Sequence, residues 1–136
     1  ASLWRIPILF IVENNHYAQS TPSRLQIAGA ISKRAEAFNI KTTHCTSNDV
    51  KDIYPIIKKS VNYVKEKQNP YFLLLNTFRL CHHSKNDDNR PRAEIEKWEK
   101  KDPILIGNEI SPTKKTSIDQ KIKNKINSIV HELIGR

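Results

Sequence analysis

The sequence Ile6-Pro7-Ile8-Leu9-Phe10-Ile11-Val12 runs without a polar residue and stops at Glu13-Asn14-Asn15-His16-Tyr17. Continuous Ile, Leu and Val runs bounded by polar turn residues are typical of strands buried on both faces of a parallel sheet. We therefore predict a central strand over residues 6–12, with the Asn pair at its carboxyl end. Ligands of open α/β sheets bind at that edge, where amide and carbonyl oxygens suit Mg²⁺ carrying a phosphate group. The segment thus predicts a phosphate-bearing cofactor.

Two later segments predict further strands of the same sheet. Residues 41–45 form a weaker candidate, and residues 71–75 are apolar on both faces. A helix is predicted over residues 28–38, between the first two strands. Strands that alternate with helices predict β-α-β units with right-handed crossovers. We therefore expect an α/β fold with a parallel sheet and flanking helices.

A second helix is predicted between the second and third strands. Its apolar residues recur at helical spacing, at Val50, Ile53, Ile57, Val61 and Val64. We expect Ser47 or Asn48 to cap its first turn, and Asp49 to lie where the helix dipole favours a negative charge. Pro55 lies near the first turns, where it should kink the helix without ending it.

The last predicted element is an amphipathic helix over residues 117–135. Ser117-Ile118-Asp119-Gln120 has the pattern of a capping box. An apolar stripe follows it, at Ile118, Ile122, Ile126, Ile129, Val130 and Leu133. We expect this helix to pack against the sheet or a partner subunit and not to lie on a membrane.

The composition favours one domain over residues 1–136 in a reducing compartment. The formal net charge is +9, but the lysines are spread over helical faces and are not interleaved with aromatic residues that would stack on bases. We therefore do not expect a nucleic-acid partner. The only cysteines are Cys45 and Cys81, and the first apolar run is shorter than the ~20 residues a membrane span needs. No membrane partner is expected either.

Four segments, in chain order, resemble the alpha subunit of thiamine-diphosphate-dependent 2-oxo acid dehydrogenases. They are Ala1-Ser2-Leu3-Trp4-Arg5-Ile6-Pro7, Glu13-Asn14-Asn15-His16-Tyr17-Ala18, Phe78-Arg79-Leu80-Cys81-His82-His83-Ser84 and Lys101-Asp102-Pro103-Ile104. That family includes the pyruvate, branched-chain 2-oxo acid and acetoin enzymes. The resemblance implies the carboxyl-terminal half of a thiamine-diphosphate-binding α/β module, followed by the terminal helix.

The same resemblance implies an activity for the intact protein. It would oxidatively decarboxylate a small 2-oxo acid with thiamine diphosphate and Mg²⁺, and pass the acyl group to a lipoyl-bearing acyltransferase. A beta subunit or beta-like domain would complete a heterotetramer in the bacterial cytoplasm or the mitochondrial matrix. The substrate stays open, although the pattern of His82-His83-Ser84 and Asp87-Asp88 is closer to the branched-chain type.

Metal ligands follow from the resemblance at two positions. Asn15 would bind Mg²⁺ through its side chain and Tyr17 through its main chain, while the Gly-Asp-Gly segment that supplies the rest would fall upstream of Ala1. We therefore expect the 136 residues to be a fragment that does not bind the cofactor tightly and is inactive alone. The alternative is an Asn pair that only turns the chain, since Asn tolerates left-handed conformations and caps turns.

The loop after the third strand would carry the second group of site residues. By resemblance, His83 is catalytic and contacts the cofactor as a hydrogen-bond donor, and Ser84 matches a serine phosphorylated in mitochondrial members. Arg79 would bind phosphate or pair with Asp87-Asp88, and holding the loop is the favoured role. Residues 78–92 are expected to form a mobile active-site loop. The alternative is an exposed polar loop with an incidental His.

The same residues allow two other functions. A zinc site from Cys81, His82 and His83 with His44 or Cys45 is disfavoured, because adjacent residues do not converge easily on one tetrahedral ion. The chain would otherwise be a non-catalytic basic scaffold in an assembly, with Asn15 and His83 as relics.

Overall fold

The computed structural model describes residues 1–85, 87–106 and 111–135. The chain divides into two units, Ala1–Ile106 and Gly107–Arg136. The first unit contains the sheet and the residues of the candidate site. Each unit is described by itself.

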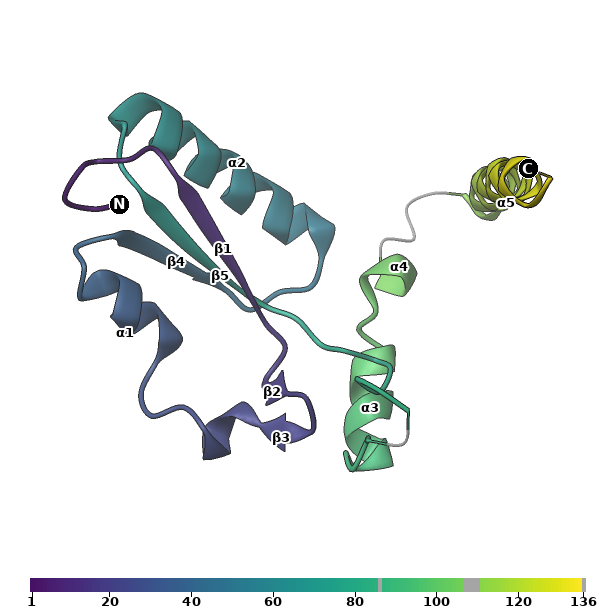
Figure 1. The fold of residues 1–136 in the computed structure, drawn as a ribbon, viewed down its shortest axis with the longest axis horizontal. Helices are drawn as coiled ribbons and strands as arrows, with labels where there is room; N and C mark the ends of the chain where they lie inside the picture. The colour runs from purple at the N-terminus through teal and green to yellow at the C-terminus, as the bar shows by residue number, and fades with distance from the viewer. Residues whose placement is uncertain (86, 107–110, 136) are drawn as a thin grey trace. The chain divides into compact units, whose positions relative to one another are not determined.

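The first unit is built on a three-stranded parallel sheet (Figure 1). Its strands are β1 (Leu9–Asn14), β5 (Tyr71–Asn76) and β4 (Lys41–Cys45), in that spatial order. Leu9 pairs with Tyr71 and Asn14 with Asn76, so β1 and β5 begin and end together. The predicted parallel sheet is confirmed, and the second predicted strand is found at its predicted bounds.

The prediction of a central first strand is wrong within the described part of the chain. β5 is central, and β1 lies at the edge with Ile11 48% exposed. An apolar run indicates that the side chains of a strand are buried by other elements, but it does not identify which strands lie beside it in the sheet. The strand also begins three residues later than predicted, since Pro7 has no amide and the amide of Ile8 bonds to the carbonyl of Ile6.

The core lies between the sheet and α2 (Val50–Lys67). Cys45, Leu73 and Leu75 are buried, and the partly buried residues Leu9, Ile53, Ile56 and Ile57 pack against them. Helix α1 (Ile31–Glu36) covers the other face of the sheet (Figure 1). These contacts account for the apolar spacing along α2, although Val50 is exposed.

The boundaries of α1 and α2 differ from the predicted ones. Asp49 caps α2 by accepting a hydrogen bond from the amide of Lys51 at 2.9 Å. Ser47 instead accepts a hydrogen bond from the amide of Asp49 and donates one to the Asp52 carboxylate. Helix α1 is shorter than residues 28–38 because Gly29 and Asn39 have left-handed φ angles of 73° and 56°. Pro55 lies inside α2 without ending it.

Five short elements complete the first unit. A small hairpin follows β1, and helices follow the loop after β5. These elements are β2 (Tyr17–Ala18), β3 (Thr21–Pro22), the 3₁₀ turn η1 (Ser23–Leu25), α3 (Arg92–Glu99) and α4 (Pro103–Ile106). The sequence did not predict them.

The second unit contains helix α5 (Pro112–Ile134). The predicted capping box at Ser117 is wrong, because Ser111 caps the helix and Pro112 occupies its first turn. Proline is favoured there, since its missing amide would have no helical partner. The predicted apolar stripe is exposed within this unit, with Ile122 52% exposed. None of the helices in the described ranges is long and apolar enough to cross a membrane.

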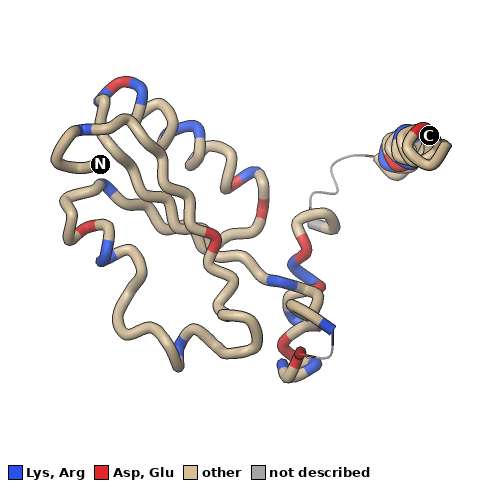
Figure 2. Tube along the Cα trace, viewed as in Figure 1, with Lys and Arg blue, Asp and Glu red and all other residues tan. Residues whose placement is uncertain are grey.

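Lysine and arginine are distributed along the elements of the first unit (Figure 2). Blue segments alternate with red and tan ones and do not gather into one continuous stripe. This distribution agrees with solvated basic faces, as expected from the sequence.

Candidate functional site

Two loops leave the sheet side by side at its carboxyl edge. Asn14 and Asn76 are the last paired residues of β1 and β5, and the amide of Thr77 donates to the carbonyl of Asn14 at 2.9 Å. The segment that carries Asn15 and Tyr17 therefore starts next to the segment that carries Arg79 and His83. This is the edge at which parallel α/β sheets bind ligands.

The Asn pair folds into two consecutive side-chain turns. Oδ1 of Asn14 accepts from the amide of His16 at 3.1 Å, and Oδ1 of Asn15 accepts from the amide of Tyr17 at 2.9 Å. His16 has a φ of 65°. The chain-turning alternative is therefore observed in the geometry.

The turn geometry is also compatible with a hard cation. An amide oxygen has two lone pairs, so Oδ1 of Asn15 can accept the Tyr17 amide and still coordinate a metal. The same turn holds the Tyr17 backbone next to the Asn15 side chain. Neutral oxygen donors suit Mg²⁺, and phosphate and water oxygens commonly supply its remaining ligands.

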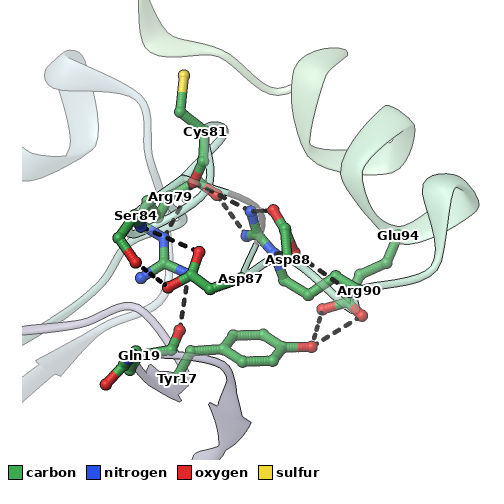
Figure 3. Close-up of polar contacts among 9 residues, drawn as sticks. All are labelled: Tyr17, Gln19, Arg79, Cys81, Ser84, Asp87, Asp88, Arg90 and Glu94. Atoms are coloured by element: carbon green, nitrogen blue, oxygen red, sulfur yellow. Dashed lines mark hydrogen bonds and ion pairs between the residues drawn. The ribbon is translucent and has the colours of Figure 1, made fainter.

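The Tyr17 side chain anchors this turn to helix α3. Its hydroxyl lies 3.0 Å from both carboxylate oxygens of Glu94 (Figure 3). Burial, followed by the hydrogen bond to Glu94, raises the pKa of Tyr17 above its usual value. The main chain of Tyr17 is the expected metal ligand, and its side chain is held by Glu94, which lies far away in the sequence.

Arg90 is the centre of the loop after β5. Its side chain is only 2% exposed, and its guanidinium donates to both carboxylate oxygens of Asp88 and to the carbonyls of Arg79 and Cys81 (Figure 3). The hydrogen bond from Arg90 holds the pKa of Asp88 well below its usual range, and the same bond raises the pKa of Arg90. The buried guanidinium of Arg90 therefore links the beginning of this loop, at Arg79 and Cys81, to its end at Asp88.

Aromatic rings surround the same guanidinium. The Arg90 carbon Cζ lies 5.0 Å from the ring centroid of Phe78 and 5.5 Å from that of Tyr17. Phe78 stacks on Trp98 of α3 with centroids 4.9 Å apart and planes 8° from parallel. The attraction between the Arg90 guanidinium and these rings stabilises the loop in addition to the hydrogen bonds, because the guanidinium is partly desolvated.

Arg79 joins the two loops. It donates to the carbonyl of Gln19 at 2.7 Å and to the carbonyl of Cys81 at 3.0 Å. The pairing with Asp87-Asp88, one of the expected roles of Arg79, is not among the bonds of the described residues, because Asp88 bonds to Arg90 and Asp87 bonds to Ser84. The guanidinium of Arg79 has five N–H donors, and two of its nitrogens donate to the backbone carbonyls of Gln19 and Cys81.

Ser84 and Asp87 form a closed turn of their own. Asp87 accepts from both the amide and the hydroxyl of Ser84, each at 2.9 Å. The hydrogen bond from the Ser84 amide is the main cause that lowers the pKa of Asp87, and His83 and Arg79 contribute smaller electrostatic effects. His82 and His83 are both exposed. The structure thus places Asn15, Tyr17 and Arg79 in one bonded region and leaves His83 on the exposed side of its loop.

The predicted mobile loop falls within the described residues except for residue 86. Its polar contacts gather at Arg90 and at the turn of Ser84 and Asp87. Its mobility stays a prediction.

The zinc arrangement is not formed. His44 bonds to Asn76 at 3.0 Å, and the buried thiol of Cys45 points to the carbonyl of Ser47 while Cys81 is exposed. Across the described ranges no group of three or more His, Cys, Asp and Glu residues could hold a metal.

Sequence reasoning missed Arg90, Glu94 and Trp98. Arg90 shows one weak signal, an Asp two residues before it in a polar loop. Glu94 and Trp98 show none, because their partners Tyr17 and Phe78 lie far away in the sequence.

Comparison with known proteins identifies the family of the chain. The family model of the dehydrogenase E1 component matches residues 1–135. The chain belongs to the dehydrogenase E1 component family. Members of this family use thiamine diphosphate.

Relatives within the dehydrogenase E1 family are alpha subunits. The pyruvate dehydrogenase E1 component subunit alpha of Rickettsia bellii is 30% identical over 140 residues, which are 96% of this chain and 43% of that protein. The 2-oxoisovalerate dehydrogenase subunit alpha of Bacillus subtilis is 32% identical over 77% of this chain and 33% of its own length. The mitochondrial 2-oxoisovalerate dehydrogenase subunit alpha of Mus musculus is 33% identical over 75% of this chain and 24% of its own length.

This dehydrogenase E1 chain therefore spans less than half the length of the curated relatives it matches. The resemblance found in the sequence is confirmed at the level of the family.

Proposed function

We propose that the protein containing this chain is the alpha subunit of a 2-oxo acid dehydrogenase that uses thiamine diphosphate and Mg²⁺. The observation that carries the proposal is the bond between the Thr77 amide and the Asn14 carbonyl, which sets the Asn15 turn and the His83 loop at one edge of the sheet. Family membership and the alpha-subunit relatives support it. The whole reaction is oxidative decarboxylation of a small 2-oxo acid followed by acyl transfer to a lipoyl-bearing acyltransferase.

Two residues would hold the metal. Oδ1 of Asn15 and the main-chain carbonyl of Tyr17 are the hard oxygen donors of this chain, and the hydroxyl of Tyr17 on Glu94 limits how far the turn can move. Positioning donors before the ligand arrives reduces the ordering cost of binding. When bound, thiamine diphosphate supplies the carbanion chemistry, while the protein orients it and supplies charge.

His83 would act at the reacting end of the site. An imidazole in a loop above the carboxyl edge can donate a hydrogen bond to a phosphate oxygen or to the oxygen of the reacting group. Arg79 would hold this loop to the Asn15 segment through the Gln19 carbonyl and add positive charge near the diphosphate.

The same proposal implies a partner subunit and a cellular compartment for the protein. A beta subunit or beta-like domain would supply the acidic residue that activates the cofactor, in a heterotetramer. The compartment would be the bacterial cytoplasm or the mitochondrial matrix.

The experiment is a comparison of two adjacent histidines in the complete protein with its partner subunit. His83→Ala should lower the rate of lipoyl acylation by ~10²-fold or more, the scale of a positioned proton donor, without loss of subunit association. His82→Ala is the matched control and should be milder, since neighbouring side chains point in different directions. Assays with pyruvate, branched-chain 2-oxo acids and acetoin would identify the substrate. Equal and small effects from both variants would favour the non-catalytic scaffold.

A further inference from the structure

A polar cavity lies at the amino edge of the sheet, opposite the edge described above. Its volume is about 570 Å³. Figure 1 shows β1, β4 and β5 starting at this edge. The residues that line the cavity come from the segments before these strands, from the start of β4, and from α1 and α2. The polar residues that line it are Ser2, Arg5, Glu36, Asn39, Lys41 and Asn69.

The charges of the cavity favour an anion. Arg5 and Lys41 are its two cations, and Glu36 is the single acid among the residues that line it. The Glu36 carboxylate is paired with Lys33 at 2.7 Å, and that pairing offsets its charge. Ser2, Asn39 and Asn69 add neutral groups that can hydrogen-bond to oxygen.

Aromatic packing positions one of the two cations. Nζ of Lys41 lies 4.7 Å from the ring centroid of Tyr63, which also lines the cavity. The Tyr63 ring meets the ring of Tyr71 edge-on at 5.1 Å, and the Tyr71 hydroxyl is hydrogen-bonded to Thr43 at 2.6 Å. The Lys41 ammonium group therefore lies against the Tyr63 ring, although Lys41 as a residue is exposed.

We propose that this cavity binds a small molecule carrying a phosphate group, which is a dianion matched to Arg5 and Lys41. Each strand of five or six residues advances about 3.3 Å per residue, so the cavity lies roughly 15–20 Å from the carboxyl edge. A ligand bound there does not touch the reacting atoms. The site is a second anion site, separate from the cofactor site and independent of the proposed function.

The test is a calorimetric titration of the complete protein with inorganic phosphate at constant ionic strength. The titration is made with and without saturating thiamine diphosphate and Mg²⁺. Saturable phosphate binding that is unchanged by the cofactor is expected. The absence of saturable binding, or competition with thiamine diphosphate, would overturn the proposal.

Matched variants locate the site. The double variant Arg5→Gln/Lys41→Gln should weaken phosphate binding at least tenfold, whereas Arg34→Gln/Lys65→Gln removes the same charge from exposed positions of α1 and α2 and should change it less than twofold. The charge-conserving Arg5→Lys/Lys41→Arg should retain binding within about threefold, which separates loss of charge from loss of fold. Equal weakening by the first two double variants would indicate diffuse electrostatic attraction and reject the site.

Discussion

The hydroxyl of Tyr17 donates to the carboxylate of Glu94, which is 77 residues away in the sequence. The oxygen of Tyr17 lies 3.0 Å from each carboxylate oxygen, and the guanidinium of Arg90 lies over the Tyr17 ring. This contact connects the turn after β1 with helix α3 of the same unit. The proposed metal segment is thus supported by residues that are not themselves proposed as ligands.

Removing the Tyr17 hydroxyl should weaken this support. Tyr17→Phe keeps the ring over Arg90 but leaves Glu94 without its donor, so the free energy of unfolding should fall by about 1 kcal/mol. Urea denaturation of the complete protein measures the change. Tyr54→Phe is the control, because Tyr54 is 64% exposed and its loss should stay within about 0.5 kcal/mol. Equal losses in the two variants would contradict a special role for the Tyr17 hydroxyl.

Substitution of Arg90 should destabilise the loop after β5 more than substitution of any other residue in that loop. Arg90→Lys keeps the charge but cannot reach Asp88 and the carbonyls of Arg79 and Cys81 together, so we expect a loss of about 2 kcal/mol and faster hydrogen exchange over residues 79–92. The same change at Arg92, whose side chain is 71% exposed, is the control and should leave exchange in the loop unchanged. Unchanged exchange in Arg90→Lys would show that the loop is ordered by other contacts.

Low pH should destabilise the same loop, because protonation of Asp88 removes its ion pair with Arg90. Its pKa is lowered in the folded protein, so its contribution to stability is present above the ordinary carboxyl pKa of about 4 and is lost as pH falls through the folded value. Asp88→Asn should therefore be less stable than the parent protein at pH 7, and the difference should shrink below about pH 4. Urea unfolding of both proteins at several pH values measures it. A difference that stays constant down to about pH 3 would argue against the ion pair with Arg90.

The parallel sheet could be predicted because its signals are local. Residues 41–45 and 71–75 have strand composition, and the helical spacing between them fixes a right-handed crossover. The position of β1 at the edge could not be predicted, since an apolar run does not specify its neighbours. The start of α5 was missed because Ser111-Pro112 and Ser117 both fit helix-start patterns, and the proline at the first helical position favours the earlier one.

The candidate site was predictable only where a motif carried it. Asn15, Tyr17, Arg79 and His83 came from a resemblance, and three of them lie in one bonded region. Arg90 was not predicted, because its importance depends on burial and on carbonyls that only the folded loop presents. The bonds of Arg79 to the carbonyls of Gln19 and Cys81 could not be predicted for the same reason, and the nearby acids Asp87 and Asp88 bond to Ser84 and Arg90.

The central claim is that Asn15 binds the metal of the cofactor and does more than turn the chain. Asn14 and Asn15 each accept one backbone amide two residues ahead, so Asn14→Ala is a matched control for the loss of a turn. Calorimetric titration of the complete protein, with its partner, with thiamine diphosphate and Mg²⁺ is the direct measurement. Asn15→Ala should weaken Mg²⁺-dependent cofactor binding about tenfold or more, Asn15→Asp should restore much of it, and Asn14→Ala should have a clearly smaller effect. Cofactor affinity that is the same in Asn15→Ala as in the parent protein, or that falls equally in Asn14→Ala, would contradict the claim.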